Sequence, residues 1–201
     1  MSALTPSMIV GGDPNKNRNA MDFYPTPREV TVALLDFLQI PKGVKIWEPA
    51  CGQNHMVSVI RDFGYEVIGT DIQGGVDFLT SDLPNGVDWI ITNPPFKASE
   101  AFIKRCIHHG KPFALLLKSQ YWHASKRTKL FIDYPPKFVL PLNWRPDFTG
   151  KGSSLMDMIW CVWGDNYGLT FSLYKPLEKP KNKKEQNNGM HETDIKELFQ
   201  P

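Results

Sequence analysis

Short, continuously apolar runs alternate with longer segments of helical periodicity through the middle of the chain, and this alternation constrains the fold most. Helices are predicted to begin at Pro27, near His55 and at Ser99. Pro27 suits a first helical turn because no amide hydrogen is needed there, and Gly64 and Gly110 stand where helices commonly end. The apolar runs are predicted strands, at residues 45–48, 66–71, 87–92, 113–118, 137–142 and 157–163. Alternating strands and helices predict an α/β sandwich with right-handed crossovers.

The length and composition indicate one globular domain. A chain of 201 residues can bury a sizeable core as one unit, and its hydrophobic content of 41% is ordinary for a globular protein. Residues 1–20 are predicted to be a flexible lead-in, residues 21–174 the folded domain, and residues 175–201 a charged tail. Within that tail, residues 191–200 carry a pattern that suits a short additional helix.

Hydropathy, cysteines and charge narrow the function classes. No apolar run reaches the roughly 18 residues that span a bilayer, and no signal-peptide pattern is present, so a cytoplasmic location is predicted. Cys51, Cys106 and Cys161 form no CxxC pair, which argues against a zinc site and a disulfide framework. His108 and His109 would need further ligands, so no metal is expected. The net charge of +2 leaves the substrate open.

Residues that follow the first two strands are candidates for a ligand site, because ligands bind beyond the carboxyl ends of strands in such sheets. Glu48-Pro-Ala-Cys-Gly52 follows the first strand, and small residues there let the backbone come close to a ligand. Asp71 ends the second strand, and its carboxylate could accept both hydroxyls of a ribose. The spacing of roughly 20 residues favours this interpretation. An ordinary turn and a helix cap remain the alternatives.

The third strand runs into Asn93-Pro94-Pro95-Phe96, which is the most specific motif in the chain. The two prolines fix the backbone dihedral angles and supply no amide donors. Their carbonyls and the Asn93 side chain are therefore held rigidly at a strand end, with an aromatic residue next to them. No turn requires these four residues in this order, so a functional interpretation is favoured over a structural one.

In their order along the chain, Glu48-Pro-Ala-Cys-Gly52, Asp71 and Asn93-Pro-Pro-Phe96 resemble the motifs of class I S-adenosylmethionine-dependent methyltransferases that modify amino nitrogens. The resemblance is greatest to bacterial and phage-type N6-adenine DNA methyltransferases. Asp22-Phe-Tyr-Pro-Thr-Pro27 resembles their N-terminal cofactor motif, and the motif order matches their gamma arrangement. The resemblance implies a Rossmann-like sandwich, with a mostly parallel seven-stranded sheet and helices on both faces.

The same resemblance implies S-adenosylmethionine as the cofactor and assigns roles residue by residue. Thr26 would touch the amino-acid end of the cofactor, Asp71 would hold the ribose, and Asp77 with Phe78 would meet the adenine. The full set of cofactor residues that it implies is Tyr24, Thr26, Glu48, Ala50, Gly52, Asp71, Asp77, Phe78 and Asn93. The family usually has Gly where this chain has Asn54. Asn tolerates left-handed dihedral angles, whereas its side chain is expected to crowd the cofactor.

The chemistry implied for the loop at residues 93–96 is activation of a weakly nucleophilic nitrogen. The Asn93 side-chain oxygen and the Pro94 carbonyl would accept both amino hydrogens, which localises the lone pair and stabilises the charge developing on nitrogen. Phe96 would stack on the substrate ring, an interaction worth about 1–3 kcal/mol per base. Asn93, Pro94, Pro95 and Phe96 are therefore the predicted catalytic residues. In duplex DNA the target base would have to be flipped out.

Basic and aromatic residues later in the chain are candidates for substrate contacts. Those after the fourth strand are Lys118, Tyr121 and Trp122, and those in the next long loop are Trp144, Arg145 and Lys151. A core position for the aromatic residues is equally open.

The leading prediction is methylation of the N6 amino group of adenine in DNA. The alternatives are an RNA base, a protein glutamine, and a methyltransferase fold that binds without turnover. Little chain remains for a recognition domain, which points to a protein partner as one way to select the target.

Overall fold

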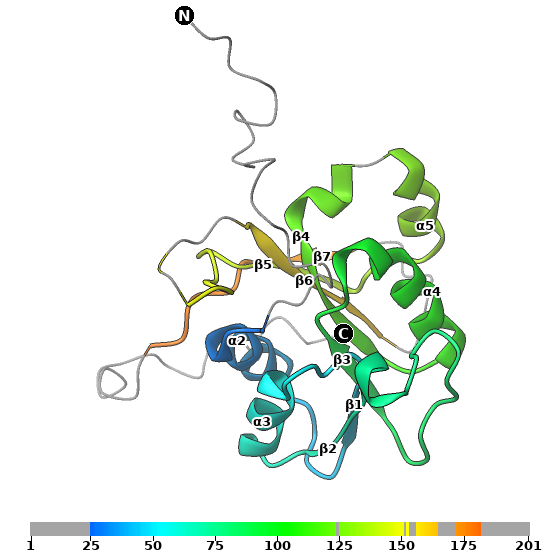
Figure 1. Ribbon diagram of the computed structural model, residues 1–201. Helices are drawn as coiled ribbons and strands as arrows, with labels where there is room; N and C mark the ends of the chain where they lie inside the picture. The colour runs from blue at the N-terminus through cyan, green and yellow to red at the C-terminus, as the bar shows by residue number, and fades with distance from the viewer. Residues whose placement is uncertain (1–24, 124, 151, 153–155, 165–171, 182–201) are drawn as a thin grey trace, which may run out of the picture.

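Within the described residues, a seven-stranded sheet forms the centre of the protein, with strand order β2-β1-β3-β4-β6-β5-β7 (Figure 1). The computed structural model describes residues 25–123, 125–150, 152, 156–164 and 172–181. The strands are β1 (Lys45–Glu48), β2 (Glu66–Gly69), β3 (Trp89–Thr92), β4 (Phe113–Lys118), β5 (Phe138–Pro141), β6 (Met158–Trp163) and β7 (Leu173–Tyr174). β6 is antiparallel to β4 and β5, and the other pairings are parallel. The mostly parallel sandwich predicted from the sequence is confirmed.

Helices cover both faces of this sheet. α2 (Arg28–Leu38) and α3 (His55–Asp62) lie on one face, and α4 (Ser99–His109) and α5 (Thr128–Asp133) lie on the other (Figure 1). The short 3-10 helices among the described residues are η1 (Ile72–Gly74), η2 (Phe96–Ala98), η3 (Ser119–His123) and η4 (Ser125–Arg127). None of the helices in this part of the chain is long and apolar enough to cross a membrane.

The alternating side chains of the central strands explain why the apolar runs are continuous. In β4, Phe113, Leu115 and Leu117 belong to the core that includes α4, whereas Ala114 and Leu116 belong to the core on the side of α2 and α3. Side chains along a strand point to opposite faces in turn, so a strand buried on both faces needs apolar residues at every position. The sheet is thus fixed between two separate cores, and its carboxyl edge stays accessible to loops.

The helix boundaries follow the local signals in the sequence. α2 begins directly after Pro27, whose carbonyl accepts the amide of Val30 at 3.1 Å. The same helix contacts the sheet through Trp160, whose Nε1 donates to the Val30 carbonyl at 3.0 Å. Gly110 ends α4 in the left-handed region with φ 66°, as predicted for a helix C-cap. These contacts hold the segment before α2 close to the sheet.

Neither β7 nor α5 was predicted from the sequence. β7 has only two residues, 44% and 66% exposed, and α5 has six, so neither offers a clear apolar period. Leu177, in the segment expected to be a charged tail, is 6% exposed, and its amide donates to the Pro141 carbonyl at 2.7 Å. The lead-in at residues 1–20 and the segment at 191–200 lie outside the described residues.

Candidate active site

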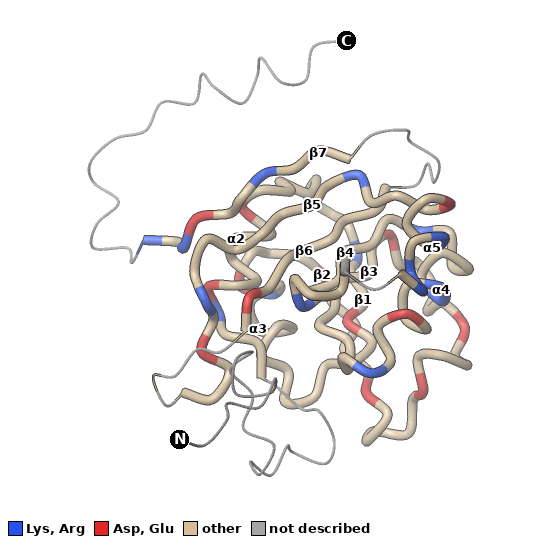
Figure 2. Tube along the Cα trace, turned by 90° about the horizontal axis from the view of Figure 1, so that it is seen from above, with Lys and Arg blue, Asp and Glu red and all other residues tan. Residues whose placement is uncertain are grey.

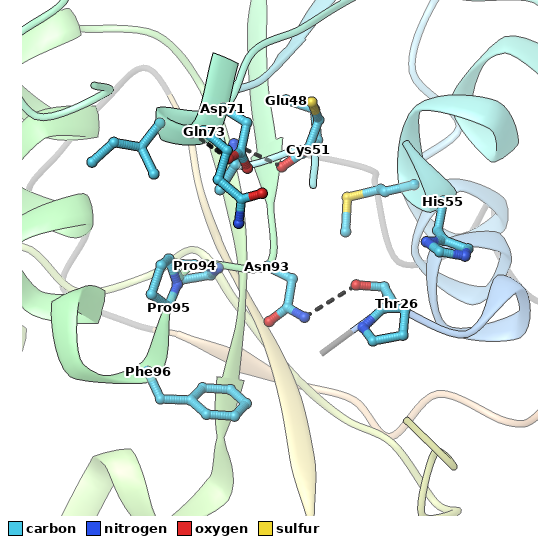
Figure 3. A pocket seen from close by; sticks show the side chains of 14 residues that line it. Thr26, Glu48, Cys51, His55, Asp71, Gln73, Asn93, Pro94, Pro95 and Phe96 are labelled. Atoms are coloured by element: carbon cyan, nitrogen blue, oxygen red, sulfur yellow. Dashed lines mark hydrogen bonds between the residues drawn. The ribbon is translucent and has the colours of Figure 1, made fainter. Parts of the chain in front are cut away.

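A cavity of about 130 Å³ opens at the carboxyl ends of β1, β2 and β3, where the strand-end motifs meet (Figure 3). Its lining includes residues from the segment before α2, from the β1–α3 turn, from η1 and from the loop after β3. These residues are Pro25, Thr26, Glu48, Ala50, Cys51, His55, Met56, Asp71, Ile72, Gln73, Asn93, Pro94, Pro95 and Phe96. Three motifs that are far apart in sequence therefore face one cavity, as the strand order requires.

The β1–α3 turn is held against the end of β2 by backbone contacts. Gly52 has φ 47°, and its amide donates to Asp71 Oδ2 at 2.9 Å. The amide of Cys51 donates to the Thr70 carbonyl at 2.9 Å. A left-handed residue that brings its amide to a carboxylate explains the preference for glycine at position 52.

Asn54 continues this turn in the left-handed conformation, with φ 64°. A Cβ built on Gly69 would lie 3.1 Å from Asn54 Oδ1, which places the Asn54 side chain against β2. Asn54 is not among the described residues that line the cavity. The left-handed turn expected of Asn54 is thus present, and its side chain does not fill the cavity.

Asp71 serves the turn and the cavity together. Its Oδ1 accepts the amide of Gln73 at 2.9 Å, which caps η1, and its Oδ2 accepts the amide of Gly52 at 2.9 Å. The helix cap that was one interpretation of Asp71 is therefore present. A carboxylate has about four acceptor sites, so two such bonds still leave acceptor capacity toward a ligand in the cavity.

Glu48 is a buried carboxyl group on the cavity wall, only 1% exposed. Its Oε1 accepts from Thr92 Oγ1 at 2.5 Å and from the Ala50 amide at 3.2 Å. Burial, with a smaller contribution from the charge of Asp71, raises the pKa of Glu48 from 4.5 to about 8 against the lowering effect of the two hydrogen bonds. A cation bound beside Glu48 would favour its ionised form.

The loop after β3 places Asn93 in the cavity next to Thr26. Asn93 Nδ2 donates to Thr26 Oγ1 at 3.1 Å, across 67 positions of sequence (Figure 3). The oxygen of the same amide lies on the side nearer Phe96 in this view. Thr26 is 7% exposed, so its hydroxyl is itself held in place. This hydrogen bond orients the Asn93 amide, which sequence reasoning did not foresee.

Phe96 and Lys118 come together at the rim of the cavity. Lys118 Nζ lies 3.9 Å from the centre of the Phe96 ring, in a cation–π contact. Lys118 ends β4, the strand beside β3, so adjacent strand ends bring the two side chains together. The structure thereby joins a predicted substrate residue to the predicted catalytic loop.

Asp77 and Phe78 have a different placement, because neither is among the described residues that line the cavity. Asp77 Oδ1 accepts the amide of Leu79 at 2.9 Å and so caps a turn. Phe78 is 2% exposed, and its ring lies 5.1 Å from that of Trp47 and 4.7 Å from that of Phe102. The ring predicted to meet the cofactor adenine is packed in the core.

Tyr121 and Trp122, the aromatic substrate candidates after β4, also pack inward. Tyr121 is 7% exposed, and the Trp122 ring stacks on Phe131 of α5 at 4.1 Å. Arg127 covers the Tyr121 ring, with its Cζ 3.8 Å from the ring centre. The core interpretation of these aromatic residues, which the sequence left open, matches their burial.

The long loop between β5 and β6 lies apart from the cavity lining. Arg145 forms an ion pair with Asp157 at 2.7 Å, and Trp144 is half-buried against the core on the side of α2 and α3. Lys151, the third candidate in this loop, lies outside the described residues. Tyr24, one of the predicted cofactor residues, also lies outside them.

Several residues that line the cavity were not among the predicted site residues, namely Pro25, Cys51, His55, Met56, Ile72 and Gln73. Ile72 is the most informative of them, because a large apolar side chain directly after a strand-end acid is 68% exposed. Its position after Asp71 was the available signal. Among the described residues, no cluster of three or more His, Cys, Asp and Glu side chains could hold a metal ion.

No protein-family profile matches the sequence, and no curated protein matches it. Solved structures do match in fold. The M protein of the type I restriction enzyme EcoKI has a TM-score of 0.51 and 16% identity, over 74% of this chain and 46% of its own. A Pyrococcus horikoshii protein assigned to the RNA methyltransferases has a TM-score of 0.50 and 13% identity, over 79% of this chain and 96% of its own.

A modification subunit from Vibrio vulnificus YJ016, assigned to a type I restriction enzyme, has a TM-score of 0.48 and 14% identity, over 72% of this chain and 45% of its own. The chain thus spans less than half the length of either modification subunit. At identities this low, the matches show a similarity of fold. The protein has the Rossmann-like fold of class I S-adenosylmethionine-dependent methyltransferases.

Proposed function

We propose that this protein transfers a methyl group from S-adenosylmethionine to the N6 amino group of adenine in DNA. The observation that carries the proposal is that Asn93 and Pro94 line the same cavity as Glu48 and Asp71, with the Asn93 amide oriented by Thr26. The acceptors for an amino group, on Asn93 and Pro94, would thereby lie beside carboxyl groups that suit the ribose and the sulfonium of S-adenosylmethionine.

The residues around the cavity fit S-adenosylmethionine. Asp71 offers carboxylate acceptors at a strand end, where a ribose diol would bind. The buried carboxyl group of Glu48 suits a positively charged neighbour, and the exposed Ile72 side chain offers an apolar surface to a flat ring. When bound, the cofactor supplies an electrophilic methyl group on a sulfonium. The resemblance assigns Thr26 to the cofactor. In this proposal its main role is to hold the Asn93 side chain by a hydrogen bond.

The loop at residues 93–96 provides the activation. Asn93 Oδ1 and the Pro94 carbonyl would accept the two hydrogens of the amino group, which withdraws the nitrogen lone pair from conjugation with the ring. Pro94 and Pro95 carry no amide hydrogen, so neither donates a hydrogen bond that would compete for these acceptors. Phe96 would stack on the base, and water can take the proton from the methylated nitrogen. A preoriented pair of acceptors needs no reorganisation during the reaction.

DNA is favoured over the alternatives by the Thr26-containing motif before α2 and by Phe rather than Tyr at position 96, both by resemblance. The fold shared with the M protein of a type I restriction enzyme is compatible with DNA, and that with an RNA methyltransferase keeps an RNA base as the second candidate. A protein partner that selects the target is part of the proposal, because the M protein that shares the fold belongs to a type I restriction enzyme.

The test is transfer of a labelled methyl group from S-adenosylmethionine to separate pools of DNA, RNA and protein. We expect label in DNA, recovered as N6-methyladenine after digestion, and a loss of at least about 100-fold in Asn93→Ala. Label found only in RNA or only in protein would refute DNA as the substrate and would identify the labelled pool as the substrate class.

Calorimetric titration of S-adenosylmethionine separates an enzyme from a fold that only binds. Cofactor binding with no transfer to any pool would favour the binding module. Failure of the folded chain to bind the cofactor at all would refute the enzymatic proposal.

A further inference from the structure

We propose that three side chains next to the catalytic loop, Lys97, Lys126 and Arg127, form a surface that contacts the sugar–phosphate backbone of the target strand. We call them the basic surface. This inference rests on the proposed function in that it takes a polynucleotide as the substrate, and it assigns the phosphate contacts to η2 and η4. The sequence offered the later loop at residues 143–152 as one candidate for this role, and η2 and η4 take its place in the proposal.

Charge pairing separates these cations from others on the molecule. Ion pairs with neighbouring carboxylates neutralise five cations, namely Arg28, Lys45, Lys104, Lys129 and Arg145. Within the described part of the chain, Lys97, Lys126 and Arg127 form no ion pair. A phosphate can therefore pair with them without first displacing a carboxylate, whereas Arg145 would have to leave Asp157.

The three cations lie close to one another around the start of α4. Lys97 directly follows Phe96, and Glu100 lies in the first turn of α4. Arg127 of η4 is bonded to Tyr121, and Tyr121 shares a buried core with Phe102 of α4, so η4 and α4 lie on the same face of the sheet. Hydrogen bonding by Lys104 lowers the pKa of Glu100, and the charges of Lys126 and Arg127 contribute to the lowering. Figure 2 shows basic segments gathered where α4 and α5 lie together. Glu100 is the carboxylate of this region, and Lys104 holds it at 2.9 Å.

Arg127 is held in a fixed position, unlike a typical surface cation. Its guanidinium lies on the Tyr121 ring, and its Nη1 donates to the Tyr121 carbonyl at 2.8 Å. Part of the entropy that a long side chain loses on binding is thus already lost. Tyr121 lies three residues after Lys118, which contacts Phe96, so the segment that holds Arg127 begins next to the aromatic ring of the catalytic loop.

The combination suits a polynucleotide. Proteins that hold a single strand or an extruded nucleotide pair a positively charged track for the backbone with an aromatic residue for the base. Here Phe96 would take the base, and Lys97, Lys126 and Arg127 would take the phosphates on either side. A glutamine side chain of a protein substrate gives no reason for such a track.

Salt dependence of binding tests the assignment. A labelled 24-nucleotide DNA, as single strand and as duplex, would be titrated with the full chain from 50 to 200 mM salt, with an RNA of the same sequence in a parallel arm. Each phosphate contact removed lowers the slope of log affinity against log salt by about 0.7 for a single strand and about 0.9 for a duplex. We expect the double variant Lys97→Gln/Lys126→Gln to lower the slope by about 1.4 for the single strand and by about 1.8 for the duplex.

The matched control is Arg61→Gln/Lys137→Gln, which removes the same charge at the opposite end of the sheet, in the last turn of α3 and before β5. We expect this control to keep the slope of the unmodified chain. Equal slopes for the two double variants would overturn the basic surface, even if DNA is methylated. A selective loss of slope without methyl transfer to any pool would support the basic surface and refute the proposed reaction. No binding of DNA or RNA by the unmodified chain would overturn the inference, while methylation of protein would still be measurable.

Discussion

Two loops at the carboxyl edge of the sheet begin with asparagine, and their comparison shows what makes a strand-end loop a site. Asn93 follows β3, lines the cavity and is hydrogen-bonded to Thr26 from a distant segment. Asn143 lies in the loop after β5, where the polar side-chain contacts of the described residues are local. There Asp147 accepts from Thr149 and Gly152, and Arg145 pairs with Asp157. The loop after β3 presents polar groups to a cavity, whereas the polar groups of the loop after β5 bond to one another and stabilise that loop.

The largest expected difference is between the two asparagines. Asn93→Ala should lower methyl transfer at least about 100-fold, because it removes an acceptor that acts on charge developing at the nitrogen. Asn143→Ala should leave the rate within about twofold, since Asn143 does not line the cavity. The measurement is the initial rate at saturating cofactor. Equal rates in the two variants would remove the distinction between the loops.

A smaller difference is expected between the two threonines that support the loops. Thr26→Val removes the acceptor for Asn93 Nδ2, and a hydrogen bond of about 0.5–1.5 kcal/mol corresponds to a fall of about 2- to 13-fold in kcat. Thr26→Ser should restore the rate. Thr149→Val removes the hydroxyl bond to Asp147, and it should leave kcat unchanged because Thr149 is not among the described residues that line the cavity. If Thr26→Val raised KM for the cofactor without changing kcat, Thr26 would be a cofactor contact and not the orienting group of Asn93.

The pKa values of one carboxyl group in each region are shifted in opposite directions, upward for Glu48 and downward for Asp147. Burial raises the pKa of Glu48 from 4.5 to about 8, so between these values the folded protein keeps a proton that the unfolded chain releases. The stability contribution of Glu48 therefore falls as pH rises from 4.5 to 8. Hydrogen bonds from Thr149 and Gly152 lower the pKa of Asp147, so its contribution is present above its ordinary pKa of 3.8 and is lost as pH falls below it.

Thermal unfolding between pH 5 and pH 8 measures this contrast. Glu48→Gln does not titrate, so its Tm should gain on that of the unmodified chain as pH rises through the window. Asp147→Asn should run parallel to the unmodified chain over the same range. A Glu48→Gln profile parallel to the unmodified one would show that Glu48 is ionised throughout.

The smallest effect is expected inside the cofactor turn itself. Asn54→Gly should change the affinity for S-adenosylmethionine by less than about twofold, because the Asn54 side chain faces Gly69 and does not line the cavity. Both residues tolerate the left-handed conformation that position 54 adopts. Calorimetry gives the dissociation constants, and a tenfold tighter complex in the variant would show that Asn54 does crowd the cofactor.

The aromatic residues show where sequence patterns stop being informative. Phe78 and Phe96 each follow a polar or fixed turn after a strand, and both were expected to contact a ligand ring. Phe96 lines the cavity, whereas Phe78 packs against Trp47 and Phe102. Local sequence gives both residues the same description. Phe78 lies beyond η1 and the turn capped by Asp77, in the core that includes Phe102 of α4, and this position depends on the tertiary packing.

The sequence by itself determined the alternation of elements, the sandwich fold and the motif at residues 93–96, because apolar periodicity and proline geometry act over a few neighbouring residues. Only the tertiary structure decided which side chains meet. The contacts of Thr26 with Asn93 and of Lys118 with Phe96 depend on strand order. Contacts between distant residues follow from how the strands are ordered in the sheet, and no local pattern in the chain encodes that order.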